Sequence, residues 1–193
     1  MSDITNLSTI DVAVSNYIAV VTMNNPPVNA QNRQFHDDLT LAFDVLSDRD
    51  DVRSIVLTGA GKCFSAGADI KGRASSKPDL GDHWSHSRRV RECFYSIMEC
   101  RKPVIAAING PALGAGLAVA ASADILIASE NASVGLPEIN VGLLGGGRHA
   151  MRLFGHSKTR RLMLTGQRLS GAELYRLGVV EECVPDDDLM RAA

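Results

Sequence analysis

The sequence lacks an excess of either charge. Lys and Arg number 20 and Asp and Glu number 22, so the 193-residue chain has a formal net charge of -2. This near-balance removes the broad basic surface that is typical of nucleic-acid-binding proteins, and no nucleic-acid partner is expected. A hydrophobic fraction of 45% is enough for a sizeable core. A single globular domain over residues 1–193 is therefore expected.

Cysteines are few and scattered. The four cysteines, at positions 63, 93, 100 and 183, form no close Cys-x-x-Cys pair. Neither a disulfide framework nor a metal site is indicated, and a reducing compartment fits this pattern. The N-terminus also lacks the basic-then-apolar pattern of a secretion signal. We therefore expect a cytoplasmic protein without a metal ion.

The sequence has no uninterrupted apolar run of the length of a membrane span. Residues 103–123 carry no charge, but Asn109, Gly110 and Pro111 interrupt them and Asp124 closes them. A strand, a turn and a buried helix explain this stretch better than a membrane-spanning helix. No membrane association is expected.

The sequence does contain alternating strand and helix patterns. Strands are expected at 10–14, 17–23, 54–58, 104–108, 125–128 and 178–183, and the first two form a pair. Helices are expected at about 32–47, 113–122, 160–164 and 171–176, with another that carries Val90, Phe94, Ile97 and Met98 on one face. Residues 71–82 contain Gly, Pro and Ser and are expected to form a loop. The alternation predicts an α/β fold with a buried, largely parallel sheet.

The same kind of strand-to-helix corner occurs twice. The two stretches are IVLTGAGKCFSAGADI (55–70) and VIAAINGPALGAGLAV (104–119), each an apolar strand, a glycine-bearing loop and a small-residue helix start. A helix start presents unpaired backbone N–H groups, and small residues let another atom approach them. Two facing corners would aim two N–H groups at one point, which is the geometry of an oxyanion hole. For one corner alone, glycines that merely allow tight turns are the simpler interpretation.

One acid is isolated in an apolar, glycine-rich stretch. Glu138 lies in PEINVGLLGGGRH (137–149), and the next carboxylates along the chain are Glu130 and Glu173. Apolar surroundings raise the pKa of a carboxyl group by penalising its charged form. Such a group suits proton abstraction near neutral pH. Glu138 is therefore either a proton carrier or a solvated turn residue.

Four stretches of the sequence resemble the crotonase, or enoyl-CoA hydratase/isomerase, family. They are FSAGADIK (64–71), KPVIAAINGPALGAGLAVAASADILIAS (102–129), VGLPEINVGL (134–143) and LTGQRLSGAELYRLGVVEECVP (164–185). The resemblance implies a crotonase-like (ClpP/crotonase) spiral of ββα units, an acyl-CoA thioester as substrate, and a homotrimer or hexamer. Family chains continue with further helices, so the C-terminal helical region is expected to be short or missing.

The resemblance also implies roles for particular residues. The backbone N–H groups of Ala68 and Ala115 would hold the thioester oxygen as it becomes an enolate, and Glu138 would be the acid/base. Coenzyme A, present only as part of the substrate, would contact Gly114 of the second corner and, in the first corner, Ala66, Ala68, Asp69, Ile70 and Lys71. No redox or metal cofactor is implied.

The sequence departs from the patterns of the family and its subclasses at four positions. Hydratases carry a second glutamate at the position of Ala118, and dienoyl-CoA isomerases carry an aspartate at the position of Gly146. Arg148 and His149 stand where the family commonly has small residues, and could pair with Glu138 or meet an unusual acyl group. Relatives with a single glutamate include enoyl-CoA isomerases.

The expected function is that of an enoyl-CoA hydratase in fatty acid β-oxidation, with three alternatives. A single-glutamate isomerase fits Ala118 chemically. A CoA-thioester hydrolase would use Glu138 or His149 to activate water. A non-catalytic protein would bind acyl-CoA without turnover.

Overall fold

A six-stranded sheet forms the centre of the computed structural model, which describes residues 4–70, 72 and 79–193. Its strands, in order across the sheet, are β1 (Ile10–Ser15), β2 (Ile18–Met23), β4 (Ser54–Gly59), β6 (Val104–Ile108), β8 (Ile125–Ser129) and β11 (Glu182–Val184). β1 runs antiparallel to β2, and all other neighbours are parallel. The expected α/β fold with a largely parallel sheet is confirmed.

Shorter strands form a second layer. They are β3 (Ala30–Gln31), β5 (Gly67–Ala68), β7 (Pro111–Leu113), β9 (Ser133–Gly135) and β10 (Arg168–Ser170). β3 pairs with β5, β7 pairs with β9, and a bridge between Ser65 and Ala112 joins the two pairs. Each of β2, β4, β6 and β8 is followed by one short strand and then a helix. This repetition confirms the spiral of ββα units.

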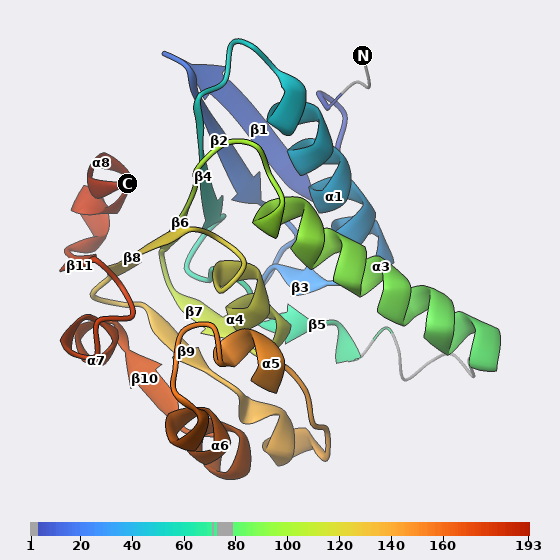
Figure 1. The fold of residues 1–193 in the computed structure, drawn as a ribbon, viewed down its shortest axis with the longest axis vertical. Helices are drawn as coiled ribbons and strands as arrows, with labels where there is room; N and C mark the ends of the chain where they lie inside the picture. The colour runs from blue at the N-terminus through green and yellow to red at the C-terminus, as the bar shows by residue number, and fades with distance from the viewer. Residues whose placement is uncertain (1–3, 71, 73–78) are drawn as a thin grey trace.

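Helices pack around both layers of strands. They are α1 (Arg33–Asp48), α3 (Leu80–Met98), α4 (Ala115–Ala120), η1 (Pro137–Val141), α5 (Gly147–Ala150), α6 (His156–Thr165), α7 (Gly171–Arg176), η2 (Asp186–Asp188) and α8 (Leu189–Ala192). Figure 1 shows α1 and α3 on one side of the main sheet and α8 on the other. α1 begins where the Asn32 side chain accepts a hydrogen bond from the Phe35 amide at 2.8 Å.

The central strands are buried on both faces. Leu57 and Ile108 belong to the large core on the side of α1 and α3. Their sequence neighbours Val56 and Ala107 point to the other face, where they pack with Leu189 of α8. Burial on both faces explains why these strands are almost continuously apolar.

Two element predictions were wrong in part. Residues 71–82 were expected to be a loop, but α3 already begins at Leu80, because Asp79 and Asp82 form a reciprocal capping box. The final strand was expected at 178–183, but β11 starts only at Glu182. Gly178, with φ +68°, instead belongs to the turn that follows α7.

Within the described part of the chain, no helix combines the length and apolar character needed to cross a membrane. The uncharged stretch 103–123 forms β6, β7 and α4, as its interruptions indicated.

Candidate active site

The first corner is shaped by a buried serine. The Ser65 side chain is fully buried, and its oxygen donates to the Asn29 carbonyl at 2.7 Å and accepts from the Gly67 amide at 3.3 Å. The Gln31 side chain donates to the same oxygen at 3.2 Å. Gly67 takes φ +92°, which other residues rarely adopt. These contacts fix the direction of the chain just before Ala68.

The second corner is the start of α4. Gly114, with φ +57°, precedes the helix, and its amide donates to the Gly135 carbonyl at 2.9 Å. Ala115 is the first helical residue, so its N–H group has no partner within the helix. The amide of Leu113 donates to the Ser65 carbonyl at 2.9 Å and ties this corner to the first one.

The two corners are in direct backbone contact. A Cβ atom placed on Gly67 would lie 2.5 Å from the Leu113 carbonyl oxygen and 3.1 Å from the Ala115 nitrogen. Only glycine fits this approach, because any side chain would collide with the opposing main chain. Gly67, the residue before Ala68, therefore lies next to Ala115, although the two come from distant parts of the sequence.

Glu138 lies against the second corner. It is half-buried in η1, and a Cβ atom placed on Gly114 would lie 2.7 Å from its Oε1 atom. Its Oε2 atom is buried and has no hydrogen-bond partner among the described residues. Burial raises the pKa of Glu138, although a backbone hydrogen bond opposes part of that shift. The acid that the sequence singled out thus lies beside the backbone of Gly114–Ala115.

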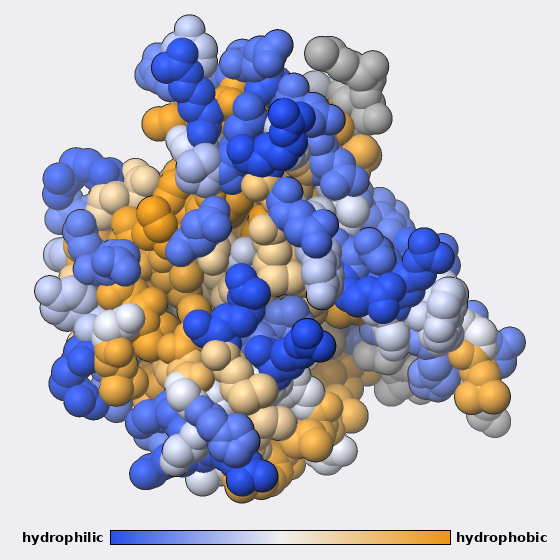
Figure 2. Space-filling model, viewed as in Figure 1, coloured by the Kyte–Doolittle hydropathy of each residue, from blue (hydrophilic) through white to orange (hydrophobic). Residues whose placement is uncertain are grey.

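Exposed apolar side chains follow this acid in the sequence. Ile139, Val141, Leu143 and Leu144 follow Glu138 closely in sequence, and each is at least 45% exposed. Figure 2 shows hydrophobic side chains at the lower right edge of the molecule, beside the largely hydrophilic surface over α6. Exposed apolar side chains of this kind favour binding of an apolar part of a ligand near the Glu138 carboxyl group.

The position of the second family glutamate is occupied by a small buried residue. Ala118 is 1% exposed within α4, and its carbonyl accepts a hydrogen bond from the Ser122 side chain at 2.8 Å. Gly146, at the start of α5, also approaches the acid, since a Cβ atom there would lie 3.8 Å from Oε1 of Glu138. Neither position supplies a second carboxylate.

The segment expected to contact coenzyme A uses several of its own polar groups internally. The Ala66 amide donates to the Val28 carbonyl and the Asp69 amide to the Gln31 carbonyl, both at 3.0 Å. The Asp69 carboxylate accepts from the Gly72 amide at 2.9 Å. In sequence, the Ala68 amide lies between the amides of Ala66 and Asp69, which form these two bonds. Ala68 directly follows Gly67, the residue that contacts the second corner.

The outer part of that segment is open to solvent. Ala66 and Ala68 are exposed, and Ile70 is 45% exposed. Lys71 lies outside the described residues, so its expected contact with coenzyme A stays a prediction. The exposed residues leave room for a ligand to approach the first corner.

Asn29 is a positioning residue that the sequence analysis missed. Its side chain is buried and donates to the carbonyls of Cys63 at 2.7 Å, Ala60 at 3.1 Å and Phe64 at 3.3 Å. It therefore holds the loop before the first corner in place. A signal was present in the sequence, because an Asn that follows Pro26-Pro27 is typical of a structured turn.

Comparisons with known proteins agree with this arrangement. The sequence model of the family described as "Enoyl-CoA hydratase/isomerase" matches residues 13–193. A "Probable enoyl-CoA hydratase" of Bacillus subtilis (strain 168) is 38% identical over 184 residues, which cover 94% of this chain and 71% of that protein. A Mycobacterium tuberculosis protein named as a hexahydroindene-carboxyl-CoA hydrolase is 37% identical, covering 91% of this chain and 71% of that protein.

Solved structures give the same result for the fold. DspI of Pseudomonas aeruginosa matches with a TM-score of 0.88 and 35% identity, over 96% of this chain and 77% of that one. An enoyl-CoA hydratase/carnithine racemase of Magnetospirillum magneticum matches with a TM-score of 0.90 and 26% identity, over 97% and 72%. The fold is therefore that of the crotonase superfamily. The chain belongs to the enoyl-CoA hydratase/isomerase family of enzymes and spans about 70% of the length of these relatives.

Proposed function

We propose that this protein acts on an acyl-CoA thioester through an oxyanion-stabilised enolate. The observation that carries the proposal is the close approach of the Glu138 carboxyl group to Gly114, the residue that precedes the Ala115 amide. A thioester oxygen held by the amides of Ala68 and Ala115 would leave the neighbouring carbon atoms near that carboxyl group. Each oxyanion-hole donor contributes about 3 kcal/mol to the stabilisation of the transition state.

Glu138 is the proposed proton carrier. In hydration, water adds across the double bond: its oxygen bonds to the third carbon, and the second carbon gains a proton. Glu138 takes a proton from the water and returns one to the second carbon, while the two amides hold the negative charge on the thioester oxygen. The raised pKa of Glu138 supports this role, because a more basic carboxylate is a better proton acceptor.

Hydratase activity is the first expectation, and isomerase activity is the second. The names of the relatives favour the hydratase. Ala118 favours an isomerase, because this residue supplies no second carboxylate and a single carboxylate suffices to move one proton between two carbons. In that reaction, Glu138 would remove a proton from the second carbon and return it to the fourth.

One experiment distinguishes these reactions. Saturated, 2-enoyl and 3-enoyl CoA esters are incubated with the protein in deuterated water and followed by mass spectrometry. Deuterium at the carbon beside the thioester supports enolate formation, water addition identifies a hydratase, and bond migration identifies an isomerase. Release of free CoA would identify a hydrolase, the activity in the name of one relative. Binding without deuterium uptake, water addition, bond migration or CoA release would overturn the proposal in favour of a non-catalytic acyl-CoA-binding protein.

The remaining parts of the proposal concern the whole protein. Coenzyme A enters only as part of the substrate, and we propose no redox or metal cofactor. A cytoplasmic protein that assembles as a homotrimer or hexamer is proposed from the resemblance to the family. Light scattering coupled to size-exclusion chromatography tests the assembly. A trimer or hexamer should have three or six times the mass of one chain. A monomer at micromolar concentration would contradict it.

A further inference from the structure

Arginine side chains from two elements line a groove between α3 and α5. The groove has a volume of about 270 Å³ and is lined by Arg91, Tyr95 and Met98 of α3 together with Arg148, His149 and Arg152. Figure 2 shows strongly hydrophilic side chains gathered at the centre of this face, over α5 and its border with α3. The groove is separate from the two corners that the proposed reaction uses.

The positive charge in this groove is poorly balanced. Of its three arginines, only Arg91 forms an ion pair within the described part of the chain, with Glu92 at 3.4 Å. Both side chains of that pair are more than half exposed, so the pair is weak. Arg148 is exposed and has no carboxylate partner in the described ranges.

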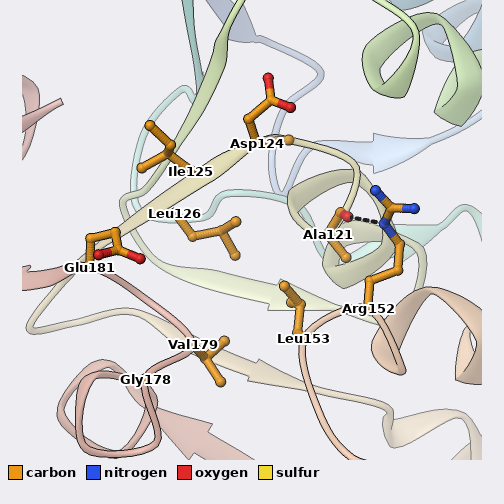
Figure 3. A pocket seen from close by; sticks show the side chains of 10 residues that line it. Ala121, Asp124, Ile125, Leu126, Arg152, Leu153, Gly178, Val179 and Glu181 are labelled. Carbon is orange, nitrogen blue, oxygen red and sulfur yellow. Dashed lines mark hydrogen bonds between the residues drawn. The ribbon is translucent and has the colours of Figure 1, made fainter.

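Arg152 also has no carboxylate partner among the residues that the structure describes. Its Nε atom donates to the Ala121 carbonyl at 2.9 Å, a bond drawn in Figure 3. The cavity in that figure also contains Asp124 and Glu181, but their side chains lie away from the guanidinium group. The Asp124 carboxylate instead accepts a hydrogen bond from the Val104 amide at 2.8 Å. Within residues 4–70, 72 and 79–193, the other guanidinium donors of Arg152 have no further acceptor.

His149 adds a polar group to the floor of the groove. Its ring packs edge-on against Phe94, with the ring centres 4.6 Å apart. Its Nδ1 atom is buried and has no hydrogen-bond partner among the described residues. Burial, then the charges of Arg152 and Arg148, lower the pKa of His149 and so favour the neutral imidazole.

We propose that the groove formed by Arg91, Arg148 and Arg152 binds an anionic group, either a carboxylate or a phosphate. Guanidinium groups present planar pairs of donors that match both anions. An anion would also neutralise the charges of Arg148 and Arg152, which have no carboxylate partner among the described residues.

The anion could come from two sources. Gly146 approaches Glu138, and Arg148 and His149 lie two and three residues after Gly146 in the sequence. The far carboxylate of a dicarboxylic acyl group is therefore one source, and this version rests on the proposed function. A free small anion, which needs no turnover, is the other source.

A binding experiment tests the groove directly. Inorganic phosphate and adipate are titrated into the protein while the His149 ring proton is followed by NMR. Because His149 lines the groove together with Arg148 and Arg152, an anion bound there changes the electrostatic surroundings of the ring and shifts this signal saturably. We expect Arg148→Gln and Arg91→Gln to weaken binding about tenfold, the effect of one charge-assisted hydrogen bond. Arg160→Gln, an exposed arginine on α6, is the matched control and leaves binding unchanged.

A kinetic experiment identifies the source. The ratio of kcat/KM for trans-2-hexenedioyl-CoA to that for trans-2-hexenoyl-CoA is measured in the same variants. A roughly tenfold fall of this ratio in Arg148→Gln, but not in Arg160→Gln, supports the acyl carboxylate as the source. A saturable His149 shift with an unchanged ratio supports a free anion.

The outcomes separate this proposal from the proposed function. An unshifted His149 signal together with an unchanged ratio overturns the anion groove, even if the enzyme is active. If neither CoA ester reacts, the proposed function fails, and the phosphate and adipate titrations alone decide whether the groove binds anions.

Discussion

At the scale of the residue, Gly114 allows the acid and the oxyanion corner to touch. Gly114→Ala would place a methyl group 2.7 Å from Oε1 of Glu138 and should displace the carboxyl group. We expect kcat to fall about 100-fold, since a displacement of about 1 Å costs that much in an active site. Steady-state kinetics measure this.

Gly178→Ala is the matched control for that substitution. Gly178 also has a positive φ, +68°, but nothing lies within 4 Å of its added Cβ atom. Both variants should lose about 1 kcal/mol or more of stability through backbone strain, while only Gly114→Ala loses activity. Equal activity in the two variants would show that the position of the Glu138 carboxyl group does not affect the reaction.

Glu138 itself should show opposite effects on activity and stability. Glu138→Gln should lower turnover at least about 100-fold, the lower end of general acid–base contributions. Because burial raises its folded-state pKa, the ionised carboxylate disfavours the folded state above that pKa. The variant should therefore melt at an equal or higher temperature than the natural protein, and Glu130→Gln, an exposed control, should change neither quantity.

Ala118 determines whether one acid or two act on the substrate. Ala118→Glu restores the carboxylate that hydratases of the family carry and should raise the ratio of hydration to isomerisation. Overpacking at this buried position should cost about 1–3 kcal/mol of stability. Ala118→Gln introduces the same volume without the charge and should leave the ratio unchanged. The products of 2-enoyl and 3-enoyl CoA esters give the ratio, and equal ratios in both variants would contradict the one-acid interpretation.

At the scale of the element, Asp38 anchors the N-terminal segment to α1. Its Oδ2 atom accepts from the Thr9 amide at 2.9 Å, the Thr9 hydroxyl at 2.8 Å and the Ser8 amide at 3.0 Å, and its Oδ1 atom accepts from Gln34 at 2.7 Å. Burial raises the pKa of Asp38, but the hydrogen bonds from Gln34, Thr9 and Ser8 outweigh it and leave the pKa lowered.

The lowered pKa of Asp38 predicts a pH dependence of stability. Its contribution is present above the unfolded pKa of about 3.9 and is lost as pH falls toward the folded pKa. Asp38→Asn should cost about 1–3 kcal/mol at pH 7, and the difference from the natural protein should shrink below about pH 4. Urea unfolding midpoints at several pH values measure this. Asp50→Asn, an exposed control, should show no such difference, and a constant gap in Asp38→Asn would contradict the account.

The sequence predicted long elements well and short ones poorly. α1 and β6 were found within one residue of their ends, because periodicity and burial mark them clearly. β7, β9 and β10 have three residues each, too few for an alternation to show. The start of α3 was missed because a capping box in a polar stretch resembles a loop.

The site was predictable where it depends on glycine and an isolated acid. The motifs indicated both corners and Glu138, and the structure brings them together. The support for the first corner was not predictable, because the hydrogen bond between Ser65 and Asn29 joins residues 36 positions apart. The arginine groove likewise combines residues of α3 and α5 that only the fold makes neighbours.

At the scale of the whole molecule, the single-domain organisation remains a prediction. One hydrophobic cluster extends from Ile4 to Val180 and includes residues of β1, α1, α3 and α7. A continuous core of this kind should unfold cooperatively. Calorimetry of the monomer should give one unfolding transition, whose calorimetric and van't Hoff enthalpies are equal. Two separable transitions in the monomer would contradict a single domain.

A crystal structure with a non-reactive acyl-CoA analogue tests the central claim most directly. The account predicts that the thioester oxygen lies about 3 Å from the amide nitrogens of both Ala68 and Ala115, with the Glu138 carboxyl group facing the carbon beside the thioester. A thioester bound away from these amides, or a Glu138 side chain turned into solvent, would contradict it.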